Sequence, residues 1–326
     1  MAEIFYWDAV RRAHDEELAH DPLVFAIGED IGLPGGTYKA TQGLFDKYGE
    51  ERVVDAPISE NSYTGIGIGA SMIGCRPIIE IMSVNFGLLA LDQIINAAAK
   101  IRYMSGGQLE CPVVIRSPGG VAHQLGAQHS GRLEKIFSGT SGLRVVTPAF
   151  PADAYGMLKT AVRCDDPVVI LEHEAIYNLK GEVADEEHFA SLEGARVVRE
   201  GSDVTLIGYL MSTHWNLAAA DKLAEQGISA EVIDLRSLKP IDSETIRQSL
   251  AKTHKAMVVT EDEAPVGMSA EIMAVINEAC FFELDAPPVR VAAEDTPIPY
   301  NHKLERAALP DADRVAEATR RLLGRA

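Results

Sequence analysis

One glutamate stands where a carboxyl group could act on a bound ligand. Glu60 follows a short apolar run at residues 53–56, and Ser59 before it is suited to cap a helix that starts there. Between Ile58 and the glycine-rich residues 64–71, its side chain would be largely buried, which would raise its pKa and let it share a proton. By position alone, a glutamate in a first helical turn is more often a surface residue that the helix dipole favours. Both interpretations are open at this stage.

A loop histidine is the second candidate. His129 lies in the stretch Gly-Ala-Gln-His-Ser at residues 126–130, after the glycine-rich residues 117–120. A histidine near strand ends could donate a proton or hydrogen-bond a substrate, although a plain surface histidine is an equal alternative. His123 lies six residues earlier, which is no recognised metal spacing, and neither H-E-x-x-H nor G-x-S-x-G occurs. Zinc-hydrolase and serine-hydrolase chemistries therefore lack their signatures.

Three glycines two residues apart, Gly65, Gly67 and Gly69, favour helix packing over nucleotide binding. A dinucleotide fingerprint is G-x-G-x-x-G directly after a first strand, and this spacing misses it. Three of the five loops that follow the predicted strands carry acidic residues, which is unusual for a phosphate site. Whatever binds at these strand ends is therefore not expected to be gripped by this chain through its phosphates.

The elements that must position these residues alternate between short apolar runs and longer amphipathic segments, which is typical of β-α units on a parallel sheet. We predict an α/β fold of two doubly wound domains with mostly parallel sheets. In the first part of the chain, strands are expected at residues 23–27, 53–56, 77–82, 113–116, 144–147 and 168–172, and helices at 4–19, 60–73, 87–104, 133–137 and 152–163. In the second part, strands are expected at 204–209, 230–234, 256–260 and 289–292, and helices at 213–225, 243–252, 269–279 and 313–323.

The periodic pattern lapses around an acidic cluster at residues 182–187. We therefore expect a first domain at residues 1–180, a linker at 181–202 and a second domain at 203–326. A second acidic run, at residues 261–263, ends a predicted strand. Such a run is usually solvated surface, and it could equally be an acidic patch on which a basic partner docks.

Composition narrows the classes of partner. The formal net charge of −18 over 326 residues repels nucleic-acid phosphates and anionic membranes, so we expect neither as a partner. The four cysteines are scattered without a C-x-x-C pair, as in proteins with reduced thiols. The sequence shows neither a signal or transit segment at its start nor an apolar run long enough to span a membrane. We expect a soluble, cytoplasmic protein.

Several motifs follow one another in one order along the chain, at residues 54–60 (VDAPISE), 85–86 (NF), 91–100 (LDQIINAAAK), 103–108 (YMSGGQ), 112–120 (PVVIRSPGG), 126–130 (GAQHS), 166–173 (DPVVILEH) and 232–240 (VIDLRSLKP). Together they resemble the β subunits of 2-oxo-acid dehydrogenase E1 components, from the first helix to the last. The fold that this resemblance implies is the pyrimidine-binding half of a transketolase-like thiamine-diphosphate enzyme, followed by a domain of the transketolase C-terminal type.

The resemblance assigns roles to individual residues. Glu60 matches the glutamate that hydrogen-bonds N1′ of the cofactor's aminopyrimidine, where a partly buried carboxyl that holds a proton would promote ionisation of the thiazolium. His129 matches a histidine near the substrate and the incoming lipoyl group. Three apolar residues match positions around the pyrimidine, although each could be plain core: Ile58, Met82 and Phe86. Backbone carbonyls that match a potassium site of some relatives belong to Val113, Ala161, Val162, Cys164 and Asp166.

An absent motif indicates that the site is shared. Thiamine enzymes hold diphosphate and Mg²⁺ with a Gly-Asp-Gly motif, and none occurs here. The resemblance then implies that an E1 α subunit holds both, in an α₂β₂ heterotetramer with thiamine diphosphate across the interface. It also implies that the acidic second domain docks the basic subunit-binding domain of the dihydrolipoyl acyltransferase E2, whose lipoyl domain receives the acyl group.

Substrate choice is the least constrained feature. Residues 105–108, 123–129 and 171–180 look most like the pyruvate branch of the family, which implies oxidative decarboxylation of pyruvate and acyl transfer to E2. The stretch Ser-Gly-Thr-Ser-Gly at residues 138–142 departs from relatives, which usually carry a more aromatic or proline-bearing stretch there. Acetoin and branched-chain 2-oxo-acid dehydrogenases therefore remain alternatives. So do a non-catalytic scaffold subunit and a self-sufficient transketolase-like synthase.

Overall fold

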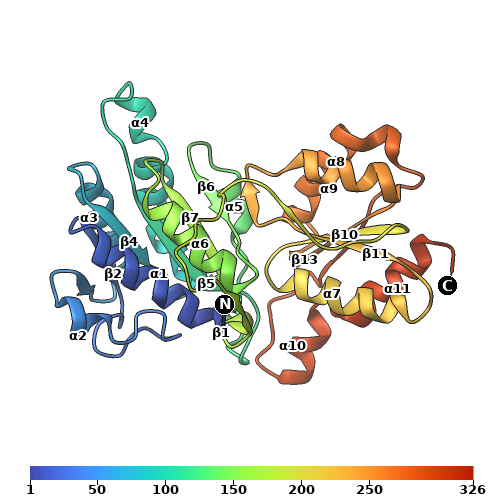
Figure 1. The fold of residues 1–326 in the computed structure, drawn as a ribbon, viewed down its shortest axis with the longest axis horizontal. Helices are drawn as coiled ribbons and strands as arrows, with labels where there is room; N and C mark the ends of the chain where they lie inside the picture. The colour runs from blue at the N-terminus through green and yellow to red at the C-terminus, as the bar shows by residue number, and fades with distance from the viewer. Residues whose placement is uncertain (326) are drawn as a thin grey trace. The chain divides into compact units, whose positions relative to one another are not determined.

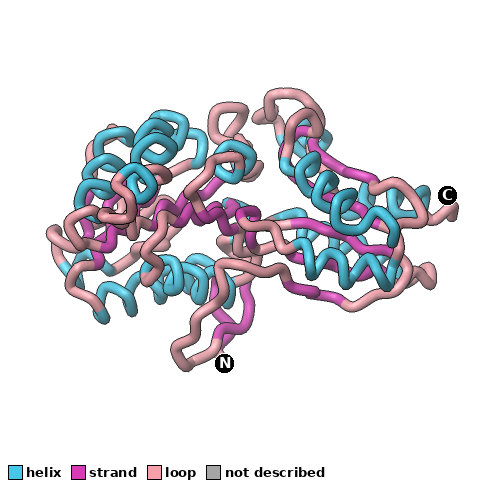
Figure 2. The backbone as a smooth tube through the Cα atoms, turned by 90° about the horizontal axis from the view of Figure 1, so that it is seen from above, coloured by secondary structure: helices cyan, strands magenta, loops and turns pink. Residues whose placement is uncertain are grey.

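The chain folds into two compact units, each with strands in a central layer and helices on both faces (Figure 1, Figure 2). The computed structural model describes residues 1–325. The first unit comprises residues 1–119 and 136–192, and the second comprises residues 120–135 and, within the described part of the chain, 193–325. The predicted fold of two α/β domains with mostly parallel sheets is confirmed.

Six neighbouring strands of the main sheet belong to the first unit and are mutually parallel, in the order β6-β7-β5-β4-β2-β3. Its central strands are buried over their whole length, as expected when helices cover both faces. The strands are β2 (Val24–Gly28), β3 (Val53–Asp55), β4 (Arg76–Glu80), β5 (Val114–Gly119), β6 (Arg144–Val146) and β7 (Val168–His173). The helices are α1 (Tyr6–His20), α2 (Leu44–Tyr48), α3 (Glu60–Ser71), the 3₁₀ helix η1 (Val84–Ala90), the π-helix η2 (Asp92–Ala98), α4 (Ile101–Met104), α5 (Glu134–Ser138), α6 (Pro151–Val162) and the 3₁₀ helix η3 (Glu174–Ile176).

The sheet of the second unit has the order β14-β13-β10-β11-β9, parallel except for the antiparallel edge strand β9. Apolar residues of its strands pack with α7 and α11 into a buried core around Leu206, Leu223 and Val315. The strands of this sheet are β9 (Arg196–Arg199), β10 (Val204–Gly208), β11 (Ala230–Asp234), β13 (Ala256–Glu263) and β14 (Val289–Ala293). The short strand β12 (Ser237–Lys239) is not part of it. The helices are α7 (Met211–Ala224), α8 (Ser243–Thr253), α9 (Met268–Cys280), the 3₁₀ helix η4 (Phe281–Glu283), α10 (His302–Ala308) and α11 (Ala312–Leu322).

Two local predictions differ from the structure. The single helix expected at residues 87–104 is instead η1, η2 and α4, because hydrogen bonds with 3₁₀ and π spacing replace the regular α-helical pattern. The stretch 181–202 is not plain linker. It contains most of β8 (Lys180–Val183), which pairs with the N-terminal strand β1 (Ala2–Phe5), and it contains β9. Pairing of these short strands with distant parts of the chain is invisible to local periodicity.

Among residues 1–325, no helix has the length and apolar character needed to cross a bilayer. All four cysteines are free, and Cys111 and Cys280 are buried.

Candidate active site

Glu60 opens helix α3, just beyond the end of β3, and only 4% of its surface is exposed. Ser59 occupies the predicted N-cap position, but its side chain makes no capping bond. Its hydroxyl lies instead 2.8 Å from the hydroxyl of Ser62. The carboxyl group of Glu60 is therefore a buried group at the start of a helix, which excludes the alternative of a solvated surface glutamate in this chain.

Two of the three glycines of α3, Gly65 and Gly67, serve packing as the sequence indicated, whereas a Cβ on Gly69 would meet nothing within 4 Å. A Cβ atom on Gly67 would lie 2.6 Å from Cδ1 of Ile79 in β4, so only glycine lets α3 lie this close to the sheet. A Cβ on Gly65 would lie 3.3 Å from the side chain of Gln93. Close packing of α3 against β4 fixes where the first turn of the helix, and hence Glu60, lies relative to the strand ends.

Other acidic groups gather at the same sheet edge. Glu29 directly follows β2 and Glu80 ends β4, and both are buried. Burial raises the pKa of the Glu29 carboxyl, and the nearby carboxyls of Glu60 and Asp30 raise it further. Burial also raises the pKa of the Tyr63 phenol, with contributions from Glu29, Glu60 and Glu80. Burial at this edge therefore favours the protonated form of the Glu29 carboxyl more than water does.

Unpaired polar atoms surround Glu60. Within residues 1–325, the hydroxyls of Tyr63 and Thr64 and one carboxyl oxygen of Glu29 are buried without a hydrogen-bond partner. Buried polar atoms are normally paired, so such a group of them indicates that a polar ligand completes the set. Thr64 lies one helical turn after Glu60, on the same face of α3. The residues present thus fit a polar heterocycle such as the aminopyrimidine of thiamine.

The apolar residues expected around that ring differ in exposure. Met82 and Phe86 are half-buried, and η1, which carries Phe86, packs against α3. Ile58 is 87% exposed, so in the isolated chain it is not part of a closed apolar wall. Other large apolar side chains on α3 and its neighbours are exposed as well: Ile66, Leu88, Leu89, Tyr103 and Met104.

A buried charge cluster behind this edge was not anticipated from the sequence. Arg116 in β5 is 1% exposed and lies between Glu80 of β4 and Glu172 of β7, with which it forms ion pairs. Its guanidinium also donates to the hydroxyl of Tyr177 at 2.8 Å, and that hydroxyl donates to Glu172. Burial raises the pKa of Glu80, although Arg116 opposes that shift. The signal in the sequence was one charged residue in each of three predicted strands that are otherwise apolar, at residues 77–82, 113–116 and 168–172.

His129 belongs to the second unit, whereas Glu60, Ile58, Met82 and Phe86 belong to the first. It is half-buried, and its backbone N–H donates to the carbonyl of Gly126 at 3.2 Å, which closes a tight turn. His123, six residues earlier, is exposed. The role of His129 stays a prediction.

The expectation of a solvated or docking surface at residues 261–263 is wrong for Glu261 and Asp262, whereas Glu263 is half-exposed. Glu261 and Asp262 are 4% and 1% exposed, so they form neither a solvated surface nor a docking patch. The carboxyl of Asp262 accepts from the backbone N–H of Met268 at 2.5 Å, at the start of α9. The carboxyl of Glu261 accepts from the backbone N–H of Val121 at 2.6 Å. Backbone donors within the same unit, rather than solvent, stabilise these charges.

The carbonyl groups expected to bind potassium already face a cation. Nη1 of Arg76 donates to the carbonyls of Val162 and Cys164, at 3.0 and 3.2 Å, and Nη2 donates to Asp165 at 2.6 Å. The carbonyls of Val113 and Ala161 accept from backbone N–H groups. A guanidinium on two of the ligand carbonyls repels a second cation, so the arrangement does not fit a free potassium ion. Potassium binding at these carbonyls remains a prediction, and the position of Arg76 argues against it.

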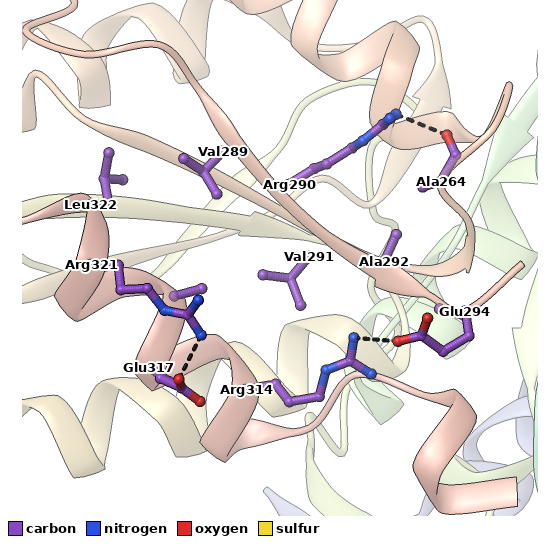
Figure 3. A pocket seen from close by; sticks show the side chains of 12 residues that line it. Ala264, Val289, Arg290, Val291, Ala292, Glu294, Arg314, Glu317, Arg321 and Leu322 are labelled. Carbon is purple, nitrogen blue, oxygen red and sulfur yellow. Dashed lines mark hydrogen bonds and ion pairs between the residues drawn. The ribbon is translucent and has the colours of Figure 1, made fainter. Parts of the chain in front are cut away.

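A cavity of about 730 Å³ lies in the second unit between β14 and α11 (Figure 3). Its charged side chains are engaged with neighbouring groups. Arg314 pairs with Glu294, Arg321 pairs with Glu317, and Arg290 donates to the carbonyl of Ala264. Two of these three arginines are paired with glutamates, and we assign the cavity no role in the chemistry.

Comparison with known proteins gives the class first. Residues 2–180 match the transketolase pyrimidine-binding domain, and residues 193–315 match the transketolase C-terminal domain. A solved structure titled split gene transketolase, inactive beta4 tetramer, superposes with a TM-score of 0.79 at 24% identity and covers 98% of both chains. The fold is therefore the transketolase-like fold.

Full-length relatives then narrow the class to a family. The chain is 47% identical over 323 residues to the pyruvate dehydrogenase E1 component subunit beta of Gracilaria tenuistipitata var. liui, covering 99% of this chain and 100% of the relative. It is 44% identical over 324 residues to the 2-oxoisovalerate dehydrogenase subunit beta of Bacillus subtilis (strain 168), covering 99% of each. The chain belongs to the family of 2-oxo-acid dehydrogenase E1 β subunits.

Proposed function

We propose that this chain is the β subunit of a thiamine-diphosphate-dependent 2-oxo-acid dehydrogenase E1 that acts on pyruvate. The complex would decarboxylate the 2-oxo acid oxidatively and transfer the acyl group to a lipoyl group of E2. One observation carries the proposal: a buried glutamate, Glu60, lies at the carboxyl edge of a parallel sheet beside unpaired buried hydroxyls. Ligands of open α/β sheets bind at this edge.

Each residue has a defined task in this proposal. Bound thiamine diphosphate supplies the electron sink that loss of CO₂ requires. Glu60 holds a proton at N1′ of the aminopyrimidine, and its burial keeps water from competing for that proton. Met82 and Phe86 flank the pyrimidine and orient it toward Glu60. His129 supplies a hydrogen bond or a proton to the substrate or to the lipoyl group.

A partner chain completes the site. The exposed apolar side chains of Ile58, Ile66 and Leu89 lie on α3 and in the segments next to it, where another protein surface would remove them from water. The buried acids at the strand ends, Glu29 and Glu80, supply no positive charge for a phosphate group, and the sequence has no Gly-Asp-Gly motif. We therefore assign the diphosphate and Mg²⁺ to an E1 α subunit within an α₂β₂ heterotetramer. The second unit would dock the basic subunit-binding domain of E2 on a surface other than the buried run at residues 261–263.

Three further points stay predictions. Relatives named for pyruvate and for 2-oxoisovalerate both align over the full length of this chain, so the family alone does not select the 2-oxo acid. A relative from Dictyostelium discoideum is named as mitochondrial, and a cytoplasmic location is our proposal for this chain. A non-catalytic scaffold has less support, because the buried Glu60 and its unpaired neighbours would then have no purpose.

Steady-state assays of the complex co-expressed with its cognate α subunit test the substrate. We expect kcat/KM for pyruvate to exceed that for branched 2-oxo acids and for acetoin by about tenfold or more, since single methylene groups change selectivity by that order. A higher kcat/KM for 2-oxoisovalerate would reassign the chain to the branched-chain enzymes. Normal turnover by the α subunit alone would contradict a catalytic role altogether.

A further inference from the structure

The segment that carries His129 is a loop closed at its base. It directly follows β5, yet residues 120–135 pack within the second unit. The backbone N–H of Gly120 donates to the carbonyl of Gly131 at 3.5 Å, which brings the two ends of the loop together. At its exposed tip, His123 and Gln124 both have φ of 59°, in the left-handed region. Two successive strained residues persist only where the surrounding structure fixes the backbone.

The acidic end of β13 provides that fixation. At the start of the loop, the backbone N–H of Val121 donates to Oε1 of Glu261 at 2.6 Å. Beyond its end, the buried guanidinium of Arg132 lies 4.0 Å from the same oxygen and forms an ion pair with Glu134. One carboxyl group, 4% exposed, therefore contacts the chain on both sides of His129. A charged acceptor makes a stronger hydrogen bond than a neutral one, especially away from water.

Further contacts reinforce the same attachment. Nζ of Lys135 lies 3.4 Å from the carboxyl of Glu263. Val121 packs in a small buried cluster with Ala293 and Leu309, next to Trp215. These contacts fix the position of the backbone segment that carries His129.

We propose that Glu261 is a positioning residue for His129, and that the second unit thereby sets where this histidine acts. This inference rests on the proposed function of His129 in substrate or lipoyl chemistry. Positioning within about 1 Å is worth roughly a hundredfold in rate, so release of the loop base should be visible in turnover even though Glu261 touches no reactant. This positioning role would explain why Glu261, which the sequence suggested was a surface residue, is buried.

The test is a double-mutant cycle in the α₂β₂ complex, with acyl transfer to a free lipoyl domain as the readout. We expect Glu261→Ala to lower kcat/KM by roughly ten- to a hundredfold. In a His129→Ala background, the same substitution should cause little further loss, because the two residues act through one arrangement. Glu261→Gln retains an oxygen that accepts from Val121 and should recover most of the activity. Glu231→Ala is the matched control, since Glu231 is equally buried in β11 and pairs with Lys252 instead.

Hydrogen exchange tests the positioning role of Glu261 separately from the proposed function of His129. Glu261→Ala should speed amide exchange at residues 120–131, and Glu231→Ala should not. Unchanged exchange there, or rate losses that add fully in the double variant, would overturn the positioning role. If His129→Ala alone leaves turnover unchanged, the proposed function of His129 fails, and the positioning role fails with it. If Glu261→Ala does not fold, the same comparisons are made with Glu261→Asp, whose shorter side chain draws the acceptor away from Val121.

Discussion

Glu60→Gln is expected to lower decarboxylation by the α₂β₂ complex by roughly a hundred- to ten-thousand-fold, the range of a lost acid–base group. Glutamine has nearly the same shape, so the start of α3 and its packing should survive. Its amide, however, cannot take up and release the proton that we assign to N1′ of the cofactor. The measurement is pyruvate-dependent reduction of an artificial electron acceptor, which reports decarboxylation without E2.

The control for this variant is Glu305→Gln. Glu305 is also a buried glutamate in the first turn of a helix, α10, but it lies in the second unit. We expect that variant to retain activity. Size-exclusion chromatography should show the same heterotetramer for both variants. Full activity of Glu60→Gln in an intact complex would refute the mechanism.

Arg116→Met is expected to destabilise the chain by roughly 3–5 kcal/mol, because it leaves Glu80 and Glu172 buried without their common cation. Methionine fills much of the volume of the arginine stem, so the loss reflects charge more than packing. The measurement is the free energy of unfolding in urea, compared with the unsubstituted chain.

The effect of Arg116→Met should depend on pH. Burial already raises the pKa of Glu80 above its ordinary value of 4.5, and Arg116 opposes this shift. Without the arginine the pKa should rise further. A carboxyl whose pKa is raised on folding stabilises the protein below its unfolded pKa and loses that contribution as pH rises through the folded value. The deficit of the variant should therefore be larger at about pH 8 than at about pH 5.5.

Arg52→Met is the matched control for that pH dependence. The guanidinium of Arg52 donates to three backbone carbonyls, those of Leu18, Asp21 and Val24, and to no carboxylate. Arg52→Met should therefore lower the free energy of unfolding by about the same amount at both pH values. An Arg116→Met deficit that is equally constant with pH would contradict the expected further rise of the Glu80 pKa.

The sequence predicts the sheet strands well because they are short apolar runs between clear breaks. Strand β7, expected at residues 168–172, spans Val168–His173. The prediction fails where distant segments decide the local structure. At residues 87–104 the α-helical period is replaced by η1 and η2, and a Cβ on Gly142 would lie 1.9 Å from the carbonyl oxygen of Ala99, so a remote loop is packed against this segment. The local sequence pattern does not predict this contact between Gly142 and Ala99.

The candidate site shows the same division. Glu60 was predicted at a strand end, and its burial follows from the glycine-rich helix that the sequence displays. Arg116 was not anticipated, because its partners Glu80 and Glu172 lie on neighbouring strands far away in the sequence. The run at residues 261–263 was misjudged for a related reason. Acidic runs are usually exposed, and the donors that stabilise this one become apparent only after folding.

Binding of thiamine diphosphate to the isolated chain and to the co-expressed complex, measured by titration calorimetry with Mg²⁺ present, tests the shared site most directly. The chain carries the buried Glu60 and unpaired hydroxyls for the pyrimidine end, but it has no Gly-Asp-Gly motif for the diphosphate and Mg²⁺. We therefore predict no binding to the isolated chain at low micromolar cofactor and clear binding to the complex. Low-micromolar binding to the isolated chain would contradict the assignment of the diphosphate to a partner subunit.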